Sequence, residues 1–538
     1  MGKKSFVKGA AILAVAGLLA KLIGALFRIP LMNIIDTEGM GIYQLAYPIY
    51  AFLLVISTAG IPTAISKLVS EMVTLGDQRG AYKIFRTSFK LLFTIGIVTS
   101  LILLVFSPLF AKLQSNESSV YALMAIAPAL FFVSLMSAYR GYFQGLQFMT
   151  PTALSQIVEQ FGKLIMGLVF ASAWIDKGPE YGAAGALLGV TLSEVAALAL
   201  LMGMFKRNRE VLFDKIRRSP KPKYYESERS LIRKILNIAI PVTIGASIMP
   251  IVNLADSVIV INRLKAVGYT KSQATSLYGM LTGGANPIIS FPTIFTVALA
   301  MSLVPAISES YASKDWKEIR NRSSVGIKLT LFIGMPAAMG MAVLSTPIIE
   351  FLYRNMDKAK AVATGELLSI LAVGVIFLTL IQTLTAILQG VDKVIVPVKN
   401  LATGAIFKII LTIVLVGIPE INVRGAAIGT VVCYGIAAIL DFAAVIRYAR
   451  VDFSIVDFIL KPAIATGVMG ICVSMTYGYS FNILGSNIKS TLLSIVVGVI
   501  IYIIMVFATG MVRRTDLELM PKGDKLVRAL DKVGLLKD

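Results

Sequence analysis

The feature that most constrains this chain is a succession of apolar segments, each long enough to cross a lipid bilayer. A helix needs about 20 apolar residues to span the roughly 30 Å hydrocarbon core, and by that rule the sequence predicts fourteen spans. Of the 538 residues, 57% are hydrophobic and 15% are charged, which leaves too little polar surface for a soluble protein of this length. We therefore predict an all-α polytopic membrane protein. The predicted spans cover residues 9–35, 42–70, 88–111, 120–143, 151–175, 183–205, 235–262, 276–309, 325–352, 364–389, 397–418, 424–447, 459–480 and 490–512.

The basic residues predict the orientation of these spans. With the N-terminus inside, 36 of the 51 Lys and Arg lie on the inner side, 10 lie on the outer side and five lie within spans. Loops rich in Lys and Arg stay in the cytoplasm, so both termini and the basic stretch 206–234 are predicted to be cytoplasmic. The net charge of +21 then reflects topology, and we expect membrane lipids rather than nucleic acid as partners.

An internal repeat predicts how the helices are grouped. Four landmarks recur at offsets of 243, 245, 245 and 240 residues: Pro62 at Pro305, Gly145 at Gly390, Lys163 at Lys408 and Gly185 at Gly425. Each copy holds six spans, an even number, so the two copies are parallel in the membrane. We predict two lobes that face each other across a central cavity and rock against one another. The predicted parts are an N-lobe (1–205), a basic cytoplasmic linker (206–234), a C-lobe (235–447), two additional helices (448–512) and an amphipathic cytoplasmic tail (513–538).

The residue types that are missing exclude several kinds of chemistry. The chain has no histidine, and its two cysteines, Cys433 and Cys472, both sit in apolar runs. It also lacks a phosphate-binding P-loop, an HExxH motif and an acidic metal cluster. We therefore expect no catalytic residues, no metal site and no bound cofactor, and we expect transport to be driven by Na⁺, H⁺ or the membrane potential.

Two cations in the first span are the main candidates for binding substrate. Lys21 and Arg28 are seven residues apart, about two helical turns, and so share one face. Charged groups inside a membrane are costly and usually face a cavity or a partner. This pair could hold an anionic group such as pyrophosphate, which arginine can bind bidentately. The alternatives are that the side chains reach an interface or pair with an internal acid.

Other polar residues within spans are candidates for lining the pathway or coupling it to an ion. Asn253 and Asp256 share a face of the seventh span, and Asp256 is the leading candidate for a cation or proton site. Glu194 and Glu159 are further ion-coupling candidates, although Glu159 could simply pair with Lys163 one turn later. Asn286 lies in the eighth span, in a Gly- and Pro-broken stretch of the kind that bends around a substrate path.

These features together resemble a known family. The Lys21-x2-Gly24-x3-Arg28-Ile-Pro30 start, the Phe143-Gln144-Gly145 turn and the architecture of two six-helix repeats plus two helices resemble the lipid-linked oligosaccharide flippases. These belong to the polysaccharide-biosynthesis family of the MOP exporter superfamily, in the branch with stage V sporulation protein B and the Gram-positive MurJ-type lipid II flippases. The resemblance implies the V-shaped lobes of MATE and MurJ proteins and a bacterial plasma membrane location.

The resemblance also implies an activity. Such proteins move undecaprenyl-pyrophosphate-linked saccharides from the inner to the outer leaflet, here most simply lipid II for peptidoglycan, with cell-wall synthesis enzymes as further partners. The cationic cavity residues of the family carry over to Arg28 and Lys21. The chain departs from the MurJ pattern because its eighth span is uncharged around Phe291-Pro292 and its second span begins Gly41-Ile-Tyr-Gln44, without an acid.

Two other classes remain open. A multidrug or organic-cation antiporter would have the same fold, but its site is expected to be acidic or aromatic, whereas the first span here offers two cations. An integral-membrane glycan polymerase or ligase would need a sizeable external loop with catalytic residues, and the longest predicted external loops have about 13 residues. Within the flippase class, spore-cortex, teichoic and capsular precursors are alternatives to lipid II.

Overall fold

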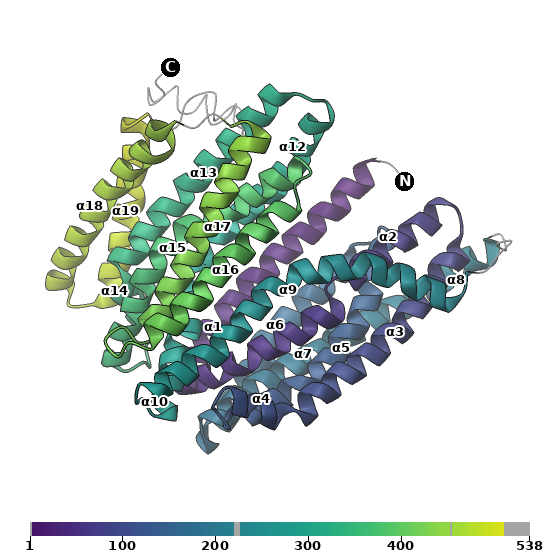
Figure 1. The fold of residues 1–538 in the computed structure, drawn as a ribbon, viewed down its shortest axis with the longest axis horizontal. Coiled ribbons are helices and arrows are strands. Elements are labelled where there is room, and N and C mark those ends of the chain that lie inside the picture. Colours follow the sequence, from purple (N-terminus) through teal and green to yellow (C-terminus); the bar gives the residue numbers. More distant parts are fainter. Residues whose placement is uncertain (1–2, 220–225, 452–453, 511–538) are drawn as a thin grey trace. The chain divides into compact units, whose positions relative to one another are not determined.

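The computed structural model describes residues 3–219, 226–451 and 454–510, and these are helical with no strand (Figure 1). Thirteen of the described helices are long and apolar enough to cross a membrane. The first candidate span, Ile12–Thr74, has 63 residues and includes most of the first predicted span and all of the second. The all-α membrane fold predicted from the sequence is therefore confirmed, and the count of fourteen spans is approximate.

The first helix doubles back within its own length. Helix α1 runs from Lys3 to Thr58 and is broken at Asp36, whose φ of 53° and ψ of −174° are not helical. A straight helix of 56 residues would be about 84 Å long, far more than one bilayer, so the break at Asp36 is what separates two crossings. Helix α2 (Ile61–Thr74) follows after a second break at Gly60, where Pro62 occupies the first turn.

The helices pack into two compact units, Met1–Gly279 and Met280–Asp538. After α1 and α2, the first unit contains α3 (Gln78–Val105), α4 (Ser107–Leu113), α5 (Ser119–Gly145), α6 (Thr150–Trp174), η1 (Ile175–Lys177), α7 (Pro179–Arg207), α8 (Arg209–Arg218), α9 (Glu228–Ala266) and α10 (Lys271–Gly279). Helices α6 and α7 lie side by side at very short range. A Cβ at Gly189 would lie 2.3 Å from the backbone nitrogen of Gly167, so small residues are what permit this approach.

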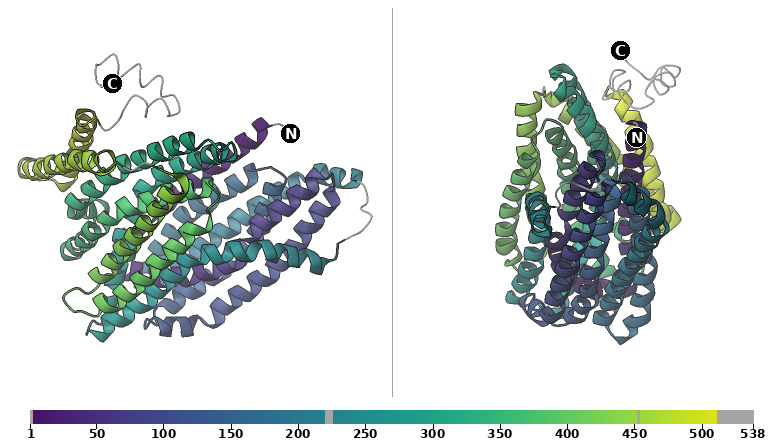
Figure 2. Two further views of the ribbon diagram at one scale, coloured as in Figure 1. Left: turned by 45° about the horizontal axis from the view of Figure 1, so that its top comes forward. Right: turned by 90° about the vertical axis from the view of Figure 1, so that its right-hand side faces the viewer.

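The second unit is built in the same way. It contains η2 (Met280–Ala285), α11 (Asn286–Ile289), α12 (Phe291–Ala312), α13 (Trp316–Val343), α14 (Ser345–Leu352), α15 (Lys358–Gly390), α16 (Ile395–Val416), α17 (Arg424–Ala449), η3 (Val456–Leu460), α18 (Lys461–Leu484) and α19 (Asn487–Ala508). The α18–α19 pair, yellow in Figures 1 and 2, packs against α13 and α14. Tyr502 of α19 anchors it by donating a hydrogen bond of 3.1 Å to the carbonyl of Phe332.

The predicted eighth span is the most irregular part of the chain. Instead of one helix over 276–309, the structure has the end of α10, the π-helical turn η2, the short α11 and then α12. Gly283, Gly284, Pro287 and Pro292 lie in or next to these breaks, which confirms the predicted interruption. The units divide at this point because of packing, whereas the predicted lobes were defined by the sequence repeat, so the lobe boundaries stay a prediction.

The basic linker is attached to the first unit. Arg79, at the start of α3, donates from Nε to the carbonyl of Ile216 at 3.1 Å, near the end of α8. The side chain of Ser219 accepts from the backbone nitrogen of Gln78 at 3.1 Å. The first bond satisfies a carbonyl near the end of α8, and the second satisfies a backbone N–H at the start of α3, groups that helix ends leave unpaired. The predicted amphipathic tail, 513–538, lies outside the described residues.

Candidate functional site

Five charged residues gather in the first unit, on helices that are candidate membrane spans. Arg28 comes from α1, Arg140 from α5, Glu159 and Lys163 from α6, and Glu194 from α7. We call them the charge cluster. Charges at such positions are expensive unless they are paired or face a functional cavity, so the partner of each one decides what the cluster can do.

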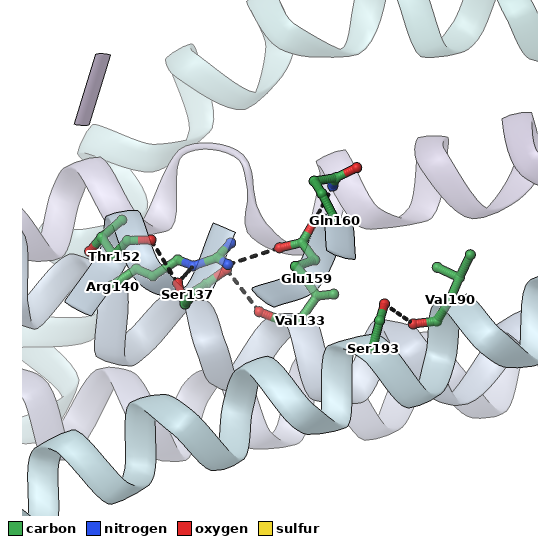
Figure 3. Close-up of polar contacts among 9 residues, drawn as sticks. Val133, Ser137, Arg140, Thr152, Glu159, Gln160, Val190 and Ser193 are labelled. Carbon is green, nitrogen blue, oxygen red and sulfur yellow. Dashed lines mark hydrogen bonds and ion pairs between the residues drawn. The ribbon is translucent and has the colours of Figure 1, made fainter. Parts of the chain in front are cut away.

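Arg140 and Glu159 form the paired half of the charge cluster. The Nη2 atom of Arg140 lies 2.8 Å from Oε2 of Glu159, and their side chains are 16% and 21% exposed. Arg140 also donates from Nε to Ser155 at 2.9 Å, and Gln160 donates to the other carboxylate oxygen of Glu159 at 3.1 Å. Figure 3 shows the guanidinium of Arg140 pointing toward Glu159, with Gln160 on the other side of the carboxylate. Glu159 therefore pairs with Arg140, not with Lys163 as one sequence-based alternative supposed.

Lys163 is held by aromatic rings. Its side chain is buried, with 8% of the residue exposed. The ammonium nitrogen lies 5.2 Å from the ring centre of Phe27 and 5.2 Å from that of Tyr47, both on α1. The faces of these rings attract the cation. No described carboxylate forms a salt bridge with Lys163, so its charge is stabilised but not neutralised.

Arg28 is a second cation without a neutralising acid. It is half-buried on α1, one residue after Phe27, and lies within electrostatic range of Lys163 and Tyr43. Among the residues that the structure describes, no carboxylate forms a salt bridge with it. Two like charges held near each other in a membrane-spanning bundle favour the binding of an anion between or beside them. Lys21, two turns earlier, is exposed and lies outside the buried cluster.

Glu194 is the unsatisfied acid of the charge cluster. It is 4% exposed, and its Oε2 atom has no hydrogen-bond partner within the described part of the chain. Glu159, Arg140 and Lys163 all act on it electrostatically. Buried polar atoms are nearly always paired in native structures, so this oxygen is a vacant acceptor for a proton or a small cation.

The other predicted site residues lie on other helices than the charge cluster. Asp256 is half-buried on α9 within electrostatic range of Tyr278 on α10, and Asn253 is exposed on the same helix. Asn286 is half-buried at the start of α11, in the second unit. No group of three or more acids, Cys or His that could hold a metal exists in the described residues.

The sequence analysis did not identify Arg140 or a row of three tyrosines on α1. Arg140 lies three residues from the end of a predicted span, so it was counted as a loop charge, although its side chain is mostly buried. Tyr43, Tyr47 and Tyr50 sit at i, i+4 and i+7 of α1 and form a ladder with ring centres 5.8 Å apart at each step. This spacing, which places three tyrosines on one helical face, was the available signal.

The chain matches known families and proteins over most of its length. The sequence model of the family "Polysaccharide biosynthesis protein" matches residues 6–311, and that of MatE matches residues 281–414. Stage V sporulation protein B of Bacillus subtilis (strain 168) is 27% identical over 98% of this chain and 100% of its own. The lipid II flippase MurJ of the same organism is 24% identical over 87% of this chain and 88% of its own.

Solved structures show the same fold. An inward-facing MATE-family multidrug transporter of the MOP superfamily aligns with a TM-score of 0.68 and 15% identity, covering 80% of this chain and 94% of the other. The lipid II flippase MurJ in an inward closed conformation aligns with a TM-score of 0.65 and 18% identity, covering 92% of this chain and 98% of the other.

Proposed function

This chain belongs to the polysaccharide biosynthesis protein family, and on that premise we propose that it is a flippase for an undecaprenyl-pyrophosphate-linked saccharide. It is a transporter rather than a catalytic enzyme, and it moves its substrate from the inner to the outer leaflet by alternating access. The relative named a lipid II flippase supports lipid II, the peptidoglycan precursor, as the first candidate substrate. The stage V sporulation relative keeps a spore-cortex precursor as the alternative.

The observation that carries the proposal is the pair of cations without acids, Arg28 and Lys163. Phosphate groups are recognised best by arginine, whose planar guanidinium can donate two parallel hydrogen bonds. Lys163, held against Phe27 and Tyr47, adds a second positive charge that forms no salt bridge with a described carboxylate. A pyrophosphate would supply the missing negative charge, whereas an organic cation would add to the repulsion. The cluster therefore favours the flippase over the drug antiporter.

The lipid part of such a substrate needs an apolar surface, and the second unit has one. A cavity of about 480 Å³ lies among α13, α14, α18 and α19. Its lining is almost entirely apolar and includes Phe332, Met341, Met469, Val499 and Ile503. We propose that it receives part of the polyprenyl chain, because an apolar pocket is the kind of site that binds a hydrocarbon chain.

Glu194 is our candidate for coupling transport to an ion. A proton or Na⁺ bound at Oε2 would satisfy an acceptor that is otherwise orphaned, and would change the field on Arg140 and Lys163. Asp256 is the second candidate, on α9. The asymmetry of Lys and Arg between the two sides supports a bacterial plasma membrane orientation with both termini cytoplasmic, where cell-wall synthesis enzymes would receive the product outside.

Complementation tests the proposal. The full chain is expressed in bacteria depleted of their own lipid II flippase, and survival and externally accessible lipid II are scored. We expect rescue by the wild type and by Lys90→Ala, which removes an exposed cation, but not by Arg28→Ala. Rescue by Arg28→Ala would refute the pyrophosphate site. Failure of the inserted wild type would refute lipid II as substrate, and drug-efflux and other lipid-linked glycan assays would then separate the remaining classes.

A further inference from the structure

A second apolar cavity opens on the surface of the second unit. It is bounded by α13, α15, α17 and η3 and has a volume of about 310 Å³. This volume is at the small end of the usual range of ligand pockets, about 300–1,000 Å³. Its eleven lining residues are all apolar. Two of them, Ile439 and Ile459, are 65% and 50% exposed, so the cavity is open to whatever surrounds the helices.

Three cations stand at the ends of the same helices, each held over an aromatic ring. Arg450, directly after α17, lies 4.6 Å from the ring centre of Trp316, the first residue of α13. Arg447 and Lys393 lie 5.5 and 5.2 Å from the ring centre of Tyr448. None of the three forms a salt bridge within the described residues. We call these three side chains the basic rim.

The acids near the basic rim are mostly engaged elsewhere. Asp315 accepts from the backbone nitrogen of Glu318 at 3.0 Å and so caps α13. Glu318 pairs with Arg322 at 2.6 Å, and Asp457 pairs with Lys461 at 2.7 Å. Asp392 is exposed to solvent beside Lys393. Capping α13 does not remove the charge of Asp315, but among these described residues the three rim cations still outnumber Asp315 and Asp392.

The cavity and the basic rim belong to one continuous structure. Trp316 and Tyr448, which hold the cations, pack against the same hydrophobic cluster that contains Ile327, Leu331 and Phe458 of the cavity wall. Along α17, Phe442 of the cavity is eight residues before Arg450, a rise of about 12 Å. This spacing places the cavity a little less than the depth of one leaflet beneath the three cations, because a whole bilayer core is about 30 Å thick and each leaflet takes about half of it.

We propose that this surface binds an anionic two-chain phospholipid, with one acyl chain in the cavity and the phosphate at the basic rim. The predicted topology puts the rim on the cytoplasmic side, where negatively charged lipid headgroups attract Lys and Arg beside membrane helices. A neutral lipid would fill the slot but leave the three cations without an anion. The site shares no residue with the charge cluster or with the cavity among α13, α14, α18 and α19, and its occupant need not be transported.

The test uses Trp316 as the reporter. The chain has two tryptophans, Trp174 and Trp316, so Trp174→Phe leaves one emitter at the basic rim. The protein is placed in vesicles free of isoprenoid lipids that contain a small fraction of either brominated phosphatidylglycerol or brominated phosphatidylcholine. Bromine on the acyl chain quenches tryptophan at close range, so quenching measures local occupancy by each lipid.

We expect stronger quenching by the anionic lipid. Each rim cation contributes about fivefold to the preference, so Lys393→Ala, Arg447→Ala and Arg450→Ala combined should abolish it. Ile439→Phe, which fills the cavity at an exposed position, should lower quenching by phosphatidylglycerol, while Ile446→Phe on the same helix, outside the cavity lining, should not. Equal quenching by both lipids in the wild type would overturn the proposal. A protein that forms a dimer through this face and shows no preference between the two lipids would also overturn it.

Discussion

Replacing Gly41 with alanine tests whether close packing of α1 on α10 holds the first unit in its observed state. A Cβ at Gly41 would lie 2.1 Å from the carbonyl oxygen of Thr275, and one at Gly279 would lie 2.0 Å from that of Thr37. Ordinary contacts begin at 3.4 Å, so the two helices would have to separate by about 1.3 Å, the difference between 3.4 and 2.1 Å. Such a shift cannot be absorbed by a side-chain rotation, because the obstructing atom belongs to the backbone.

The separation would also strain two buried hydrogen bonds. Thr37 and Ser276 share a bond of 2.6 Å, and Asn116 donates to Thr275 at 2.7 Å. Overpacking costs about 1–3 kcal/mol, and each lost hydrogen bond costs about 1 kcal/mol. A total of about 3 kcal/mol would raise the population in which α10 has moved away from α1 on the order of 100-fold. In the predicted topology this end of the unit faces outward, so the change would favour opening toward the outside.

Cysteine labelling measures that population. Cys433 and Cys472 are replaced by alanine, and Ala274 of α10, which is fully buried, becomes the sole cysteine. We expect Gly41→Ala to speed its reaction with a membrane-impermeant thiol reagent added outside by up to about 100-fold. Gly17→Ala is the matched control on α1, because a Cβ there meets no atom within 4 Å. An unchanged rate for inserted Gly41→Ala protein would refute the reasoning.

Three further predictions concern charges. Glu159→Gln should leave Arg140 without its charged partner and lower the free energy of unfolding by about 3 kcal/mol. Adding Arg140→Gln should restore part of that lost stability. A double variant whose loss of stability equals the sum of the two single losses would contradict the pairing. Glu194→Gln should keep the fold but remove the dependence of transport on Na⁺ or pH, measured as flipping in vesicles, and retained dependence would move the search to Asp256. Hydrogen bonds from Lys234 and Ser230 lower the pKa of Glu226. The stability that this contact gives the linker is therefore present above pH about 4.3 and is lost as pH falls through the lower pKa of the folded state. Limited proteolysis of the linker should accelerate only at acidic pH, and Glu226→Gln should remove that dependence.

The membrane fold was predictable because the signals for it lie within short stretches of the sequence. Runs of about 20 apolar residues, the broken eighth span and the excess of inner Lys and Arg need no knowledge of distant contacts. The predicted boundary between the first two spans, 36–41, contains the break at Asp36, but the sequence did not indicate that a single non-helical residue would make it.

The candidate site was only half predictable for a related reason. A charge inside an apolar run, such as Arg28 or Glu194, can be identified from the sequence alone. Its partner does not, because pairing joins helices far apart in the chain. The link between Arg140 and Glu159 spans two helices, and the contact of Lys163 with Phe27 spans α6 and α1, so periodicity within one helix could suggest only the local neighbour.

The charge cluster also has a consequence for electrical current. Three cations, Arg28, Arg140 and Lys163, face two acids, Glu159 and Glu194, so the empty cluster carries +1 with both acids ionised and +2 when Glu194 holds a proton. Moving one charge through the whole field of a 100 mV potential changes the free energy by about 2.3 kcal/mol. An inside-negative voltage would therefore draw the unloaded transporter back toward the cytoplasmic face, while a bound pyrophosphate would cancel that pull if Glu194 holds a proton and reverse it if Glu194 is ionised. Voltage would then favour the return of the empty carrier, in addition to any ion that Glu194 couples to transport.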